Sequence, residues 1–422
     1  MKVAPFVLTS FLLRFTSVSS LSLRAGDKTV TVGEEHILTY DLASHESSTA
    51  GLVRGRKLVD GKEYTTDTDF DRGISVNVNH DDTNDQLQLD SEATPFNFIW
   101  IPISNLNLVV KVDTDTGDIL GTYRTAPAGA SGDPSRTTVD RDGSVWVANR
   151  AANPGTIVHI GLKENNQCQD RNSNPGIQTS NGTDPLGWTT TGLTGGDPGV
   201  GNAEDECIVH YTKVSSCGTR HLSIDAANNV WVSGIGCGRR WDLVKGGRFD
   251  TNQSGTIIRS RSGFGYGGYG GLTDPSGIIW SASPLLRWNP DPAPGAALNT
   301  YDHDSYGLCI DSQGNVWNTA LYGNAIRKFN SGGVEIGTYP HGYNNAQGCV
   351  VDRNDDVWVA HSLISMSINS VGHLKNDGTH VGNVIVGSGP TGVSVDRNGK
   401  IWSANYYDGT LSRIDPNGGA AG

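Results

Sequence analysis

Charged residues and long hydrophobic runs are both scarce in this sequence. Only 18% of the 422 residues are charged, whereas 55 are glycine. Beyond the N-terminus, no stretch approaches the roughly 20 apolar residues that are needed to cross a bilayer. A low charge density with so much glycine argues against a helical bundle and indicates a chain with many tight turns. We therefore expect no integral membrane segment.

Basic residues are too few to balance the acidic ones. The chain carries 32 Lys and Arg against 44 Asp and Glu, which gives a formal net charge of −12. Such a chain repels nucleic acid and anionic membranes at long range. The sequence also lacks a Gly-x-Ser-x-Gly elbow, a phosphate-binding loop, a Cys-x-x-Cys pair and two histidines at ligand spacing. We therefore expect no nucleic acid partner and no structural zinc site.

The N-terminus has the pattern of a signal peptide. Lys2 is followed by a largely apolar stretch from Val3 to Leu13, and Val18–Ser20 offers small residues for cleavage. Arg14 interrupts this pattern and leaves an ordinary N-terminal strand as the alternative. Residues 1–20 are therefore predicted to be removed on secretion.

One unit recurs along the chain. It consists of an apolar strand that ends in Asp, a polar turn with Gly or Asn, and a second strand that contains Trp. The clearest copies are Gly307–Trp317 and Gly392–Trp402. Seven copies centre on tryptophans, which are Trp100, Trp146, Trp231, Trp280, Trp317, Trp358 and Trp402. The aspartates are expected to form the hairpin turns rather than to bind metal.

The spacing of these tryptophans predicts the fold. Consecutive ones are 37 to 49 residues apart, except for one gap of 85. A period of this length, with three or four short strands per copy, is typical of a β-propeller. The sequence therefore predicts an all-β fold, a seven-bladed β-propeller over residues 66–422, with an insertion at about 165–215 that accounts for the long gap.

The ends of the repeat region predict how the ring closes. The last copy ends after Thr410–Ile414 without a fourth strand. Ile74–Val78 has the alternation of a strand and can complete that blade, which removes an open edge. Two further alternating stretches, Lys28–Val32 and His36–Tyr40, have no place among seven blades. Residues 21–65 are therefore expected to form either a hairpin packed on the rim or a β arm that pairs with another subunit.

Six cysteines and two glycosylation sequons indicate an oxidising, extracellular environment. The sequons begin at Asn181 and Asn252, in polar stretches that are expected on the surface. A disulfide between Cys168 and Cys207 would close the insertion and is the preferred pairing. Buried free thiols are the alternative for the other four, which are Cys217 with Cys237 and Cys309 with Cys349.

The insertion contains a candidate calcium loop. Asp170, Asn172 and Asn174 place oxygen-bearing side chains at alternate positions before Gly176, as Ca²⁺ loops do. No Glu stands at the closing position of an EF-hand, so a plain polar turn is the alternative. Ca²⁺ is the only cofactor that these residues suggest.

A tract at 263–271 alternates glycine with Phe264, Tyr266 and Tyr269. Its aromatic rings would stack on sugars if they were exposed. The alternative is a strand at the point where blades crowd the axis and only glycine fits. We favour the second interpretation.

Two repeat copies carry a resemblance to a known family. Residues 389–402 have the pattern Gly-Pro-Thr-Gly-Val-Ser-Val-Asp-x-x-Gly-x-Ile-Trp, and residues 306–317 have the pattern Tyr-Gly-Leu-Cys-Ile-Asp-x-x-Gly-Asn-Val-Trp. Over most of residues 86–415 the chain resembles the virginiamycin B lyase-like and NHL-like β-propellers. For the lyases, this resemblance implies a Mg²⁺-assisted elimination that opens a cyclic depsipeptide, with His and Glu side chains near the channel.

The lyase signature is incomplete in this chain. The family's repeats usually contain Trp-Phe-Thr-Glu, whereas the corresponding positions here begin Trp402-Ser-Ala-Asn and Trp358-Val-Ala-His, without the acidic residue. Pro340-His341-Gly342 is similar to a Pro-His-Gly of the family but is displaced from the start of the strand. If the chain is a lyase, His341 and His361 are the candidate catalytic residues.

The sequence favours a secreted, non-enzymatic β-propeller that serves as an extracellular structural or binding module and can assemble with itself through residues 21–65. One alternative is a lyase-like enzyme with a divalent metal. The other is a glycan-binding or ligand-binding propeller without self-assembly. The expected partners are copies of the chain itself, an extracellular protein or a glycan.

Overall fold

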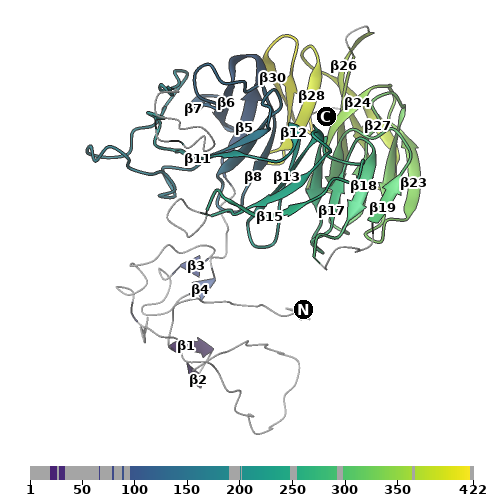
Figure 1. The fold of residues 1–422 in the computed structure, drawn as a ribbon. Helices are drawn as coiled ribbons and strands as arrows, with labels where there is room; N and C mark the ends of the chain where they lie inside the picture. The colour runs from purple at the N-terminus through teal and green to yellow at the C-terminus, as the bar shows by residue number, and fades with distance from the viewer. Residues whose placement is uncertain are drawn as a thin grey trace. The chain divides into compact units, whose positions relative to one another are not determined.

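The chain divides into two compact units, Met1–Pro95 and Phe96–Gly422, in the computed structural model. The residues that the structure describes are 20–25, 28–33, 66, 78–79, 88–89, 96–189, 200, 202–247, 254–291, 298–363 and 366–418. The larger unit is a ring of seven antiparallel blades (Figure 1). The predicted all-β, seven-bladed propeller is therefore confirmed.

Five blades have four strands each, and the innermost strand comes first in the chain in all of them. The first two of these blades contain β8 (Pro134–Val139), β9 (Val145–Asn149), β10 (Thr156–Ile160) and β11 (Ile208–Lys213), then β12 (Cys217–Ile224), β13 (Val230–Gly236), β14 (Trp241–Val244) and β15 (Ile257–Arg261). The next contains β16 (Gly271–Thr273), β17 (Ile279–Ser281), β18 (Leu285–Trp288) and β19 (Leu298–Tyr301). The last two contain β20 (Leu308–Ile310), β21 (Val316–Asn318), β22 (Ala325–Phe329) and β23 (Glu335–Pro340), then β24 (Ala346–Val351), β25 (Val357–Leu363), β26 (Met366–Leu374) and β27 (His380–Ile385).

Two blades have three strands among the described residues. One contains β5 (Phe98–Ile103), the short 3₁₀ turn η1 (Ser104–Leu106), β6 (Leu108–Asp113) and β7 (Ile119–Arg124), and the other contains β28 (Pro390–Val395), β29 (Ile401–Asn405) and β30 (Thr410–Ile414). The innermost strands contact their neighbours in the order β8, β12, β16, β20, β24 and β28. These strands surround the axis of the ring.

The repeated aspartate closes the hairpin between the first two strands of a blade. Oδ1 of Asp352 accepts hydrogen bonds from the amides of Asn354 at 2.8 Å and Asp356 at 3.0 Å. Oδ2 of the same residue accepts a hydrogen bond from Nε1 of Trp358, whose side chain is fully buried between blades. The turn-forming role predicted for these aspartates is therefore confirmed, and it also orients the core tryptophan.

The predicted insertion lies between β10 and β11. Because β11 (Ile208–Lys213) is the outermost strand of its blade, the predicted span of 165–215 includes one strand that belongs to the ring. The long gap between Trp146 and Trp231 is therefore explained by the connection that leads from Ile160 to Ile208.

The predicted closing strand is only partly within the described residues. Ile74–Asn77 lie outside them, and Val78 belongs to β3 (Val78–Asn79), which pairs with β4 (Gln88–Leu89). The outer edge of β30 has no partner strand in the described ranges. Closure of the last blade by Ile74–Val78 therefore stays a prediction.

A second two-stranded sheet lies among the described residues of the N-terminal unit. β2 (Lys28–Gly33) confirms a strand at Lys28–Val32, and it pairs antiparallel with β1 (Ser20–Ala25). The other predicted stretch, His36–Tyr40, lies outside the described residues, as do residues 1–19 of the predicted signal peptide.

All six cysteines form disulfides. Cys168 is bonded to Cys207, as preferred from the sequence, and the other two pairs are Cys217–Cys237 and Cys309–Cys349. The last of these joins the innermost strands of neighbouring blades, β20 and β24. The part of the chain that the structure describes contains no helix long and apolar enough to span a bilayer. Three disulfides are consistent with a secreted or extracellular protein.

Candidate functional site

The structure brings the two candidate lyase histidines together. His341 follows β23 and His361 lies in β25, and Nδ1 of His341 is 2.7 Å from Nε2 of His361. Both side chains are fully buried, and Nε2 of His341 and Nδ1 of His361 have no hydrogen-bond partner among the described residues. Burial lowers the pKa of His341 to about 4 and that of His361 to about 3.

This burial keeps the histidine pair out of contact with solvent. A general base must come within hydrogen-bond reach of the proton that it removes. Neither imidazole is open to solvent. The structure has a small pocket on the axis of the propeller, and neither imidazole lines it. The geometry therefore favours a packing role for His341 and His361.

Three other histidines also have hydrogen-bond partners inside the protein. His210 bonds to His159, His221 to Ser223 and Ser281, and His303 to Asn318. Burial lowers the pKa of all three imidazoles. They are therefore packed residues.

Sequence reasoning missed a buried chain of hydrogen bonds through Asp140, Ser144 and His159. Ser144 Oγ donates to Oδ2 of Asp140 and lies 2.5 Å from Nε2 of His159. These residue types match a nucleophile with its base, but at most 5% of any of them is exposed. His159 also stacks on Trp146, with ring centroids 4.1 Å apart. The chain of hydrogen bonds therefore stabilises the blade rather than meeting a substrate.

The predicted calcium loop forms turns that use its own backbone. Oδ1 of Asp170 accepts a hydrogen bond from the amide of Ser173 at 2.7 Å, and Oδ1 of Asn172 accepts one from the amide of Asn174 at 2.8 Å. All three candidate ligands are exposed. Within the described ranges, no three His, Cys, Asp or Glu side chains are grouped so that they could hold a metal ion. Calcium binding stays a prediction.

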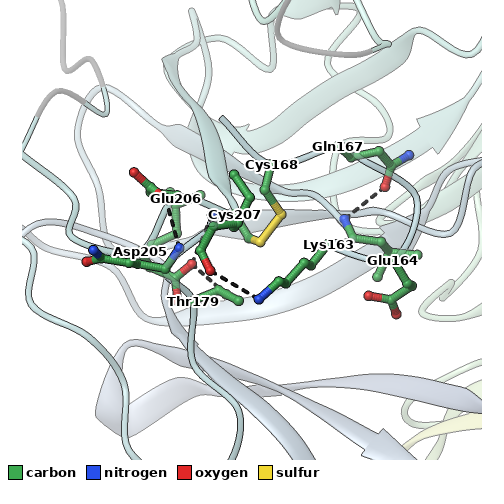
Figure 2. The surroundings of a disulfide bond; sticks show 12 residues. Lys163, Glu164, Gln167, Cys168, Thr179, Asp205, Glu206 and Cys207 are labelled. Carbon is green, nitrogen blue, oxygen red and sulfur yellow. Dashed lines mark hydrogen bonds between the residues drawn. A yellow bond between two sulfur atoms is a disulfide. The ribbon is translucent and has the colours of Figure 1, made fainter. Parts of the chain in front are cut away.

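Two acidic residues of the insertion are buried beside its disulfide (Figure 2). Oδ2 of Asp205 accepts a hydrogen bond from the amide of Ser180 at 3.0 Å, and Oε2 of Glu206 accepts one from the amide of Gln178 at 2.8 Å. Burial raises the pKa of Asp205. These carboxyl groups therefore fix the insertion next to Cys207 and are not available to a ligand.

Only one of the two sequon asparagines lies within the described residues. Asn181 is exposed in the insertion, as expected for a surface sequon, whereas Asn252 lies outside the described residues. Glycosylation at either position stays a prediction.

A pocket of about 130 Å³ lies on the axis of the ring. The innermost strands of six blades, or the residues just before them, line it. Glycine forms the wall on four of these blades, at Gly271, Gly307, Gly348 and Gly392. At Gly307, a Cβ atom would lie 2.2 Å from the carbonyl oxygen of Gln347, so only glycine lets the backbones approach this closely. The remaining wall carries Arg136, Arg220 and Tyr306.

The two arginines lie against the same aromatic ring. Cζ of Arg136 is 5.5 Å, and Cζ of Arg220 is 4.5 Å, from the ring centroid of Tyr269. Arg220 Nη1 donates to the Tyr269 hydroxyl at 3.0 Å, and that hydroxyl donates to the hydroxyl of Tyr306 at 3.0 Å. Neither guanidinium forms an ion pair with a carboxylate in the part of the chain that is described. The site therefore combines two positive charges with hydroxyl groups.

The repeat contained a signal for this site that sequence reasoning did not use. Four blades have glycine four residues before the turn aspartate, at Gly270, Gly307, Gly348 and Gly392. Arg136 occupies that position in the blade of β8, ahead of Asp140. One residue earlier in the repeat stand the other three members of the site, which are Arg220, Tyr269 and Tyr306. Arg136 thus departs from the repeated glycine, whereas the other three residues occupy a position that varies from blade to blade.

The glycine-rich tract contributes to both the axis and the pocket. A Cβ atom at Gly271 would lie 2.0 Å from the carbonyl oxygen of Trp280 in the same blade and 2.7 Å from the ring of His221 in the neighbouring blade, so glycine is required at this position. Phe264 and Tyr266 pack against buried tryptophans. Tyr269 instead lies between the two arginines and the pocket residue Tyr306.

These features define a class, the seven-bladed β-propellers with an axial pocket. No protein-family model and no curated protein matches the sequence. Among solved structures, the chain is similar to a streptogramin B lyase at 14% identity, over 76% of this chain and 90% of that one, with a TM-score of 0.51. The predicted resemblance to the virginiamycin B lyase-like propellers is therefore confirmed for the fold.

Two further solved structures show weaker similarity. One is a catalytically inactive virginiamycin B lyase from Staphylococcus aureus with quinupristin, at 13% identity over 70% of this chain and 88% of that one, with a TM-score of 0.45. The other is a protein of unknown function from Bacteroides caccae, at 10% identity over 69% and 94% of the two chains, with a TM-score of 0.44. At these identities the similarity concerns the fold alone.

Proposed function

We propose that the chain is an extracellular, non-enzymatic binding module whose ligand site is the axial pocket. The observation that carries this proposal is that Arg136 and Arg220 line the pocket and that neither has a carboxylate partner among the described residues. Placing a charged group in a partly buried site without a partner is unfavourable. A ligand that enters the pocket would supply the missing interaction.

The composition of the pocket supports binding over catalysis. Among the described residues, the pocket is lined by glycine, arginine and a few polar or apolar side chains, and by no carboxylate or imidazole. An elimination needs a group that accepts the proton. The two candidate histidines, His341 and His361, are buried elsewhere in the propeller.

Filling the pocket tests this function. Gly392 lines the pocket, and a Cβ atom placed there meets no atom within 4 Å. We therefore expect Gly392→Phe to occupy the pocket without disturbing the blade. The matched control is Gly182→Phe, since Gly182 in the insertion is equally open. A glycan array probed with the full-length proteins should show binding by the wild type and the control but not by Gly392→Phe. Equal binding by all three would contradict the proposal.

One observation favours the lyase as a second candidate function. His341 and His361 share a direct hydrogen bond, as two residues of an acid–base pair would. The test is turnover of a cyclic depsipeptide with Mg²⁺ present. Turnover that is lost in His341→Ala and in His361→Ala would support the lyase. Turnover that survives both changes would remove these two candidates, and no turnover in the wild type would favour the binding module.

We also propose that the chain assembles with itself through residues 21–65. The hairpin of β1 and β2 begins this segment, and its strands offer edges for pairing with another copy. Electron microscopy of the secreted protein should show oligomers or filaments, and a variant that lacks residues 21–65 should show single discs. Polymers that persist in the deletion variant would contradict the role of this segment.

A further inference from the structure

The charged side chains on the wall of the axial pocket are hydrogen-bond donors only. Arg136 and Arg220 carry only N–H donors and no acceptor. The Tyr269 hydroxyl accepts from Arg220 and donates to Tyr306, so the proton of the Tyr306 hydroxyl is left to donate into the site. Burial raises the pKa of Tyr306 to about 12, which keeps this proton in place at neutral pH. The site therefore presents three donor groups and two positive charges.

The two positive charges also disfavour each other. Burial is the main cause that lowers the pKa of Arg220, and the charges of Arg150 and Arg136 act in the same direction. Arg150 is compensated by an ion pair with Asp133, at 2.5 Å between Nε and Oδ2. Arg136 and Arg220 have no such partner among the described residues. An anion bound between them would remove this repulsion.

The local backbone aims both side chains at the axis. The pairing of β8 with β9 shifts register between Pro134 and Arg136, and that of β12 with β13 shifts between Thr219 and His221. Each shift is a β-bulge or a comparable irregularity, and such a feature turns a side chain out of the regular alternation. Arg136 directly follows the first shift in register, and Arg220 lies within the second.

The size of the pocket limits the ligand. Sites for drug-sized ligands usually measure about 300–1,000 Å³, whereas this pocket encloses about 130 Å³. A single small group enters such a space, together with a few waters. A carboxylate or a sulfate fits this size, and each matches the fork of N–H donors on a guanidinium.

From these observations we infer that the axial pocket binds an oxyanion, a carboxylate or sulfate group carried by the ligand, through Arg136, Arg220 and Tyr306. This inference rests on the proposed binding function and names the chemical class of its ligand.

Calorimetric titration of the full-length protein tests this inference. The probes are D-glucuronate, inorganic sulfate and uncharged D-glucose, each at millimolar concentration and constant ionic strength. We expect glucuronate or sulfate to bind and glucose not to bind. Which of the two anions binds more tightly distinguishes a carboxylate from a sulfate ligand.

Variants of Arg136 and Arg220 test whether these side chains bind the anion. Arg136→Gln and Arg220→Gln should each weaken anion binding about tenfold to a hundredfold, because a charge-assisted contact is lost. Arg136→Gly, which installs the residue found at this repeat position in four other blades, should give the same loss with the least risk to folding. The matched control is Arg141→Gln, since Arg141 is exposed in the same blade and should leave the affinity unchanged.

The outcomes separate the two proposals. Anion binding that is unchanged in Arg136→Gly and Arg220→Gln would overturn the inference. Binding of glucose that is lost in Gly392→Phe but kept in the arginine variants would also overturn it, while the binding function would stand. Failure of all three probes would overturn the oxyanion inference, and the glycan array would then decide the proposed function independently.

Discussion

The indole Nε1 of Trp358 donates a hydrogen bond to Oδ2 of Asp352, at 3.0 Å and six residues apart in the chain. The same pairing recurs in three other blades, at Asp274–Trp280, Asp311–Trp317 and Asp396–Trp402. One carboxylate thus closes a hairpin and orients the tryptophan that fills the space between blades. This pairing explains why the two residue types recur together along the sequence.

Asp352→Ala should destabilise the propeller by about 2–4 kcal/mol, because it removes acceptors for two backbone amides and one buried indole. The midpoint of denaturant unfolding measures this loss. Asp184→Ala, at an exposed position of the insertion, is the control and should leave the midpoint unchanged. Equal midpoints for Asp352→Ala and the wild type would show that the turn aspartate does not stabilise the blade.

Acid should destabilise the propeller through its buried histidines. His221 lies between Ser281 and Ser223, and burial lowers its pKa to about 3. In the unfolded chain its pKa is about 6.5. As the pH falls below 6.5, the unfolded chain takes up a proton that the folded protein does not, so stability decreases until about pH 3.

His221→Gln should remove part of this acid sensitivity. The contribution is about 1.4 kcal/mol per pH unit for one group, or about 2 kcal/mol between pH 6.5 and pH 5. Thermal unfolding at pH 7 and pH 5 measures it, with His380→Gln at an exposed position as the control. A difference between the two pH values that is the same in His221→Gln as in the wild type would show that another group causes the acid sensitivity.

The disulfide Cys168–Cys207 should stabilise the insertion and the blade that carries it. It closes a loop with a sequence separation of 39 residues, which corresponds to about 4 kcal/mol in the chain-entropy model. The double variant Cys168→Ser/Cys207→Ser should lose stability of this order in denaturant unfolding. Peptide mapping without reduction should recover the two cysteines in one linked peptide, and a link from either to another cysteine would contradict the pairing.

If the loop at Asp170, Asn172 and Asn174 is a plain polar turn, removal of calcium should leave the melting temperature unchanged. Asp170 and Asn172 already accept hydrogen bonds from nearby amides, as a polar turn requires. Scanning calorimetry with EDTA, compared with millimolar Ca²⁺, measures the effect. A rise in the melting temperature with Ca²⁺ that is lost in Asp170→Ala would instead establish the loop as a calcium site.

The fold could be predicted from the sequence because the blades are built from the same kinds of residue at the same positions. Each one needs a turn and a large buried side chain, so Asp352 and Trp358 have counterparts at a regular period. Local chemistry also sufficed for the pairing of Cys168 with Cys207, since the two cysteines bracket a single insertion.

The axial site could not be predicted in the same way. Arg136 and Arg220 lie in different blades, 84 positions apart, and only the closed ring brings them to one tyrosine. A search for known motifs does not find such residues, because the two arginines stand at different positions of the repeat and no short motif contains both. The burial of His341 and His361 was likewise hidden, because it depends on how β23, β25 and β26 pack around them.

The binding role of the axial pocket is tested most directly by locating an anion in it. Crystals of the full-length protein can be soaked in selenate, which has the shape of sulfate and scatters anomalously. We expect an anomalous peak in the axial pocket, with its oxygens within hydrogen-bond distance of Arg136 and Arg220, about 2.7–3.2 Å. Selenate bound elsewhere on the protein, with this pocket holding only water, would contradict that role.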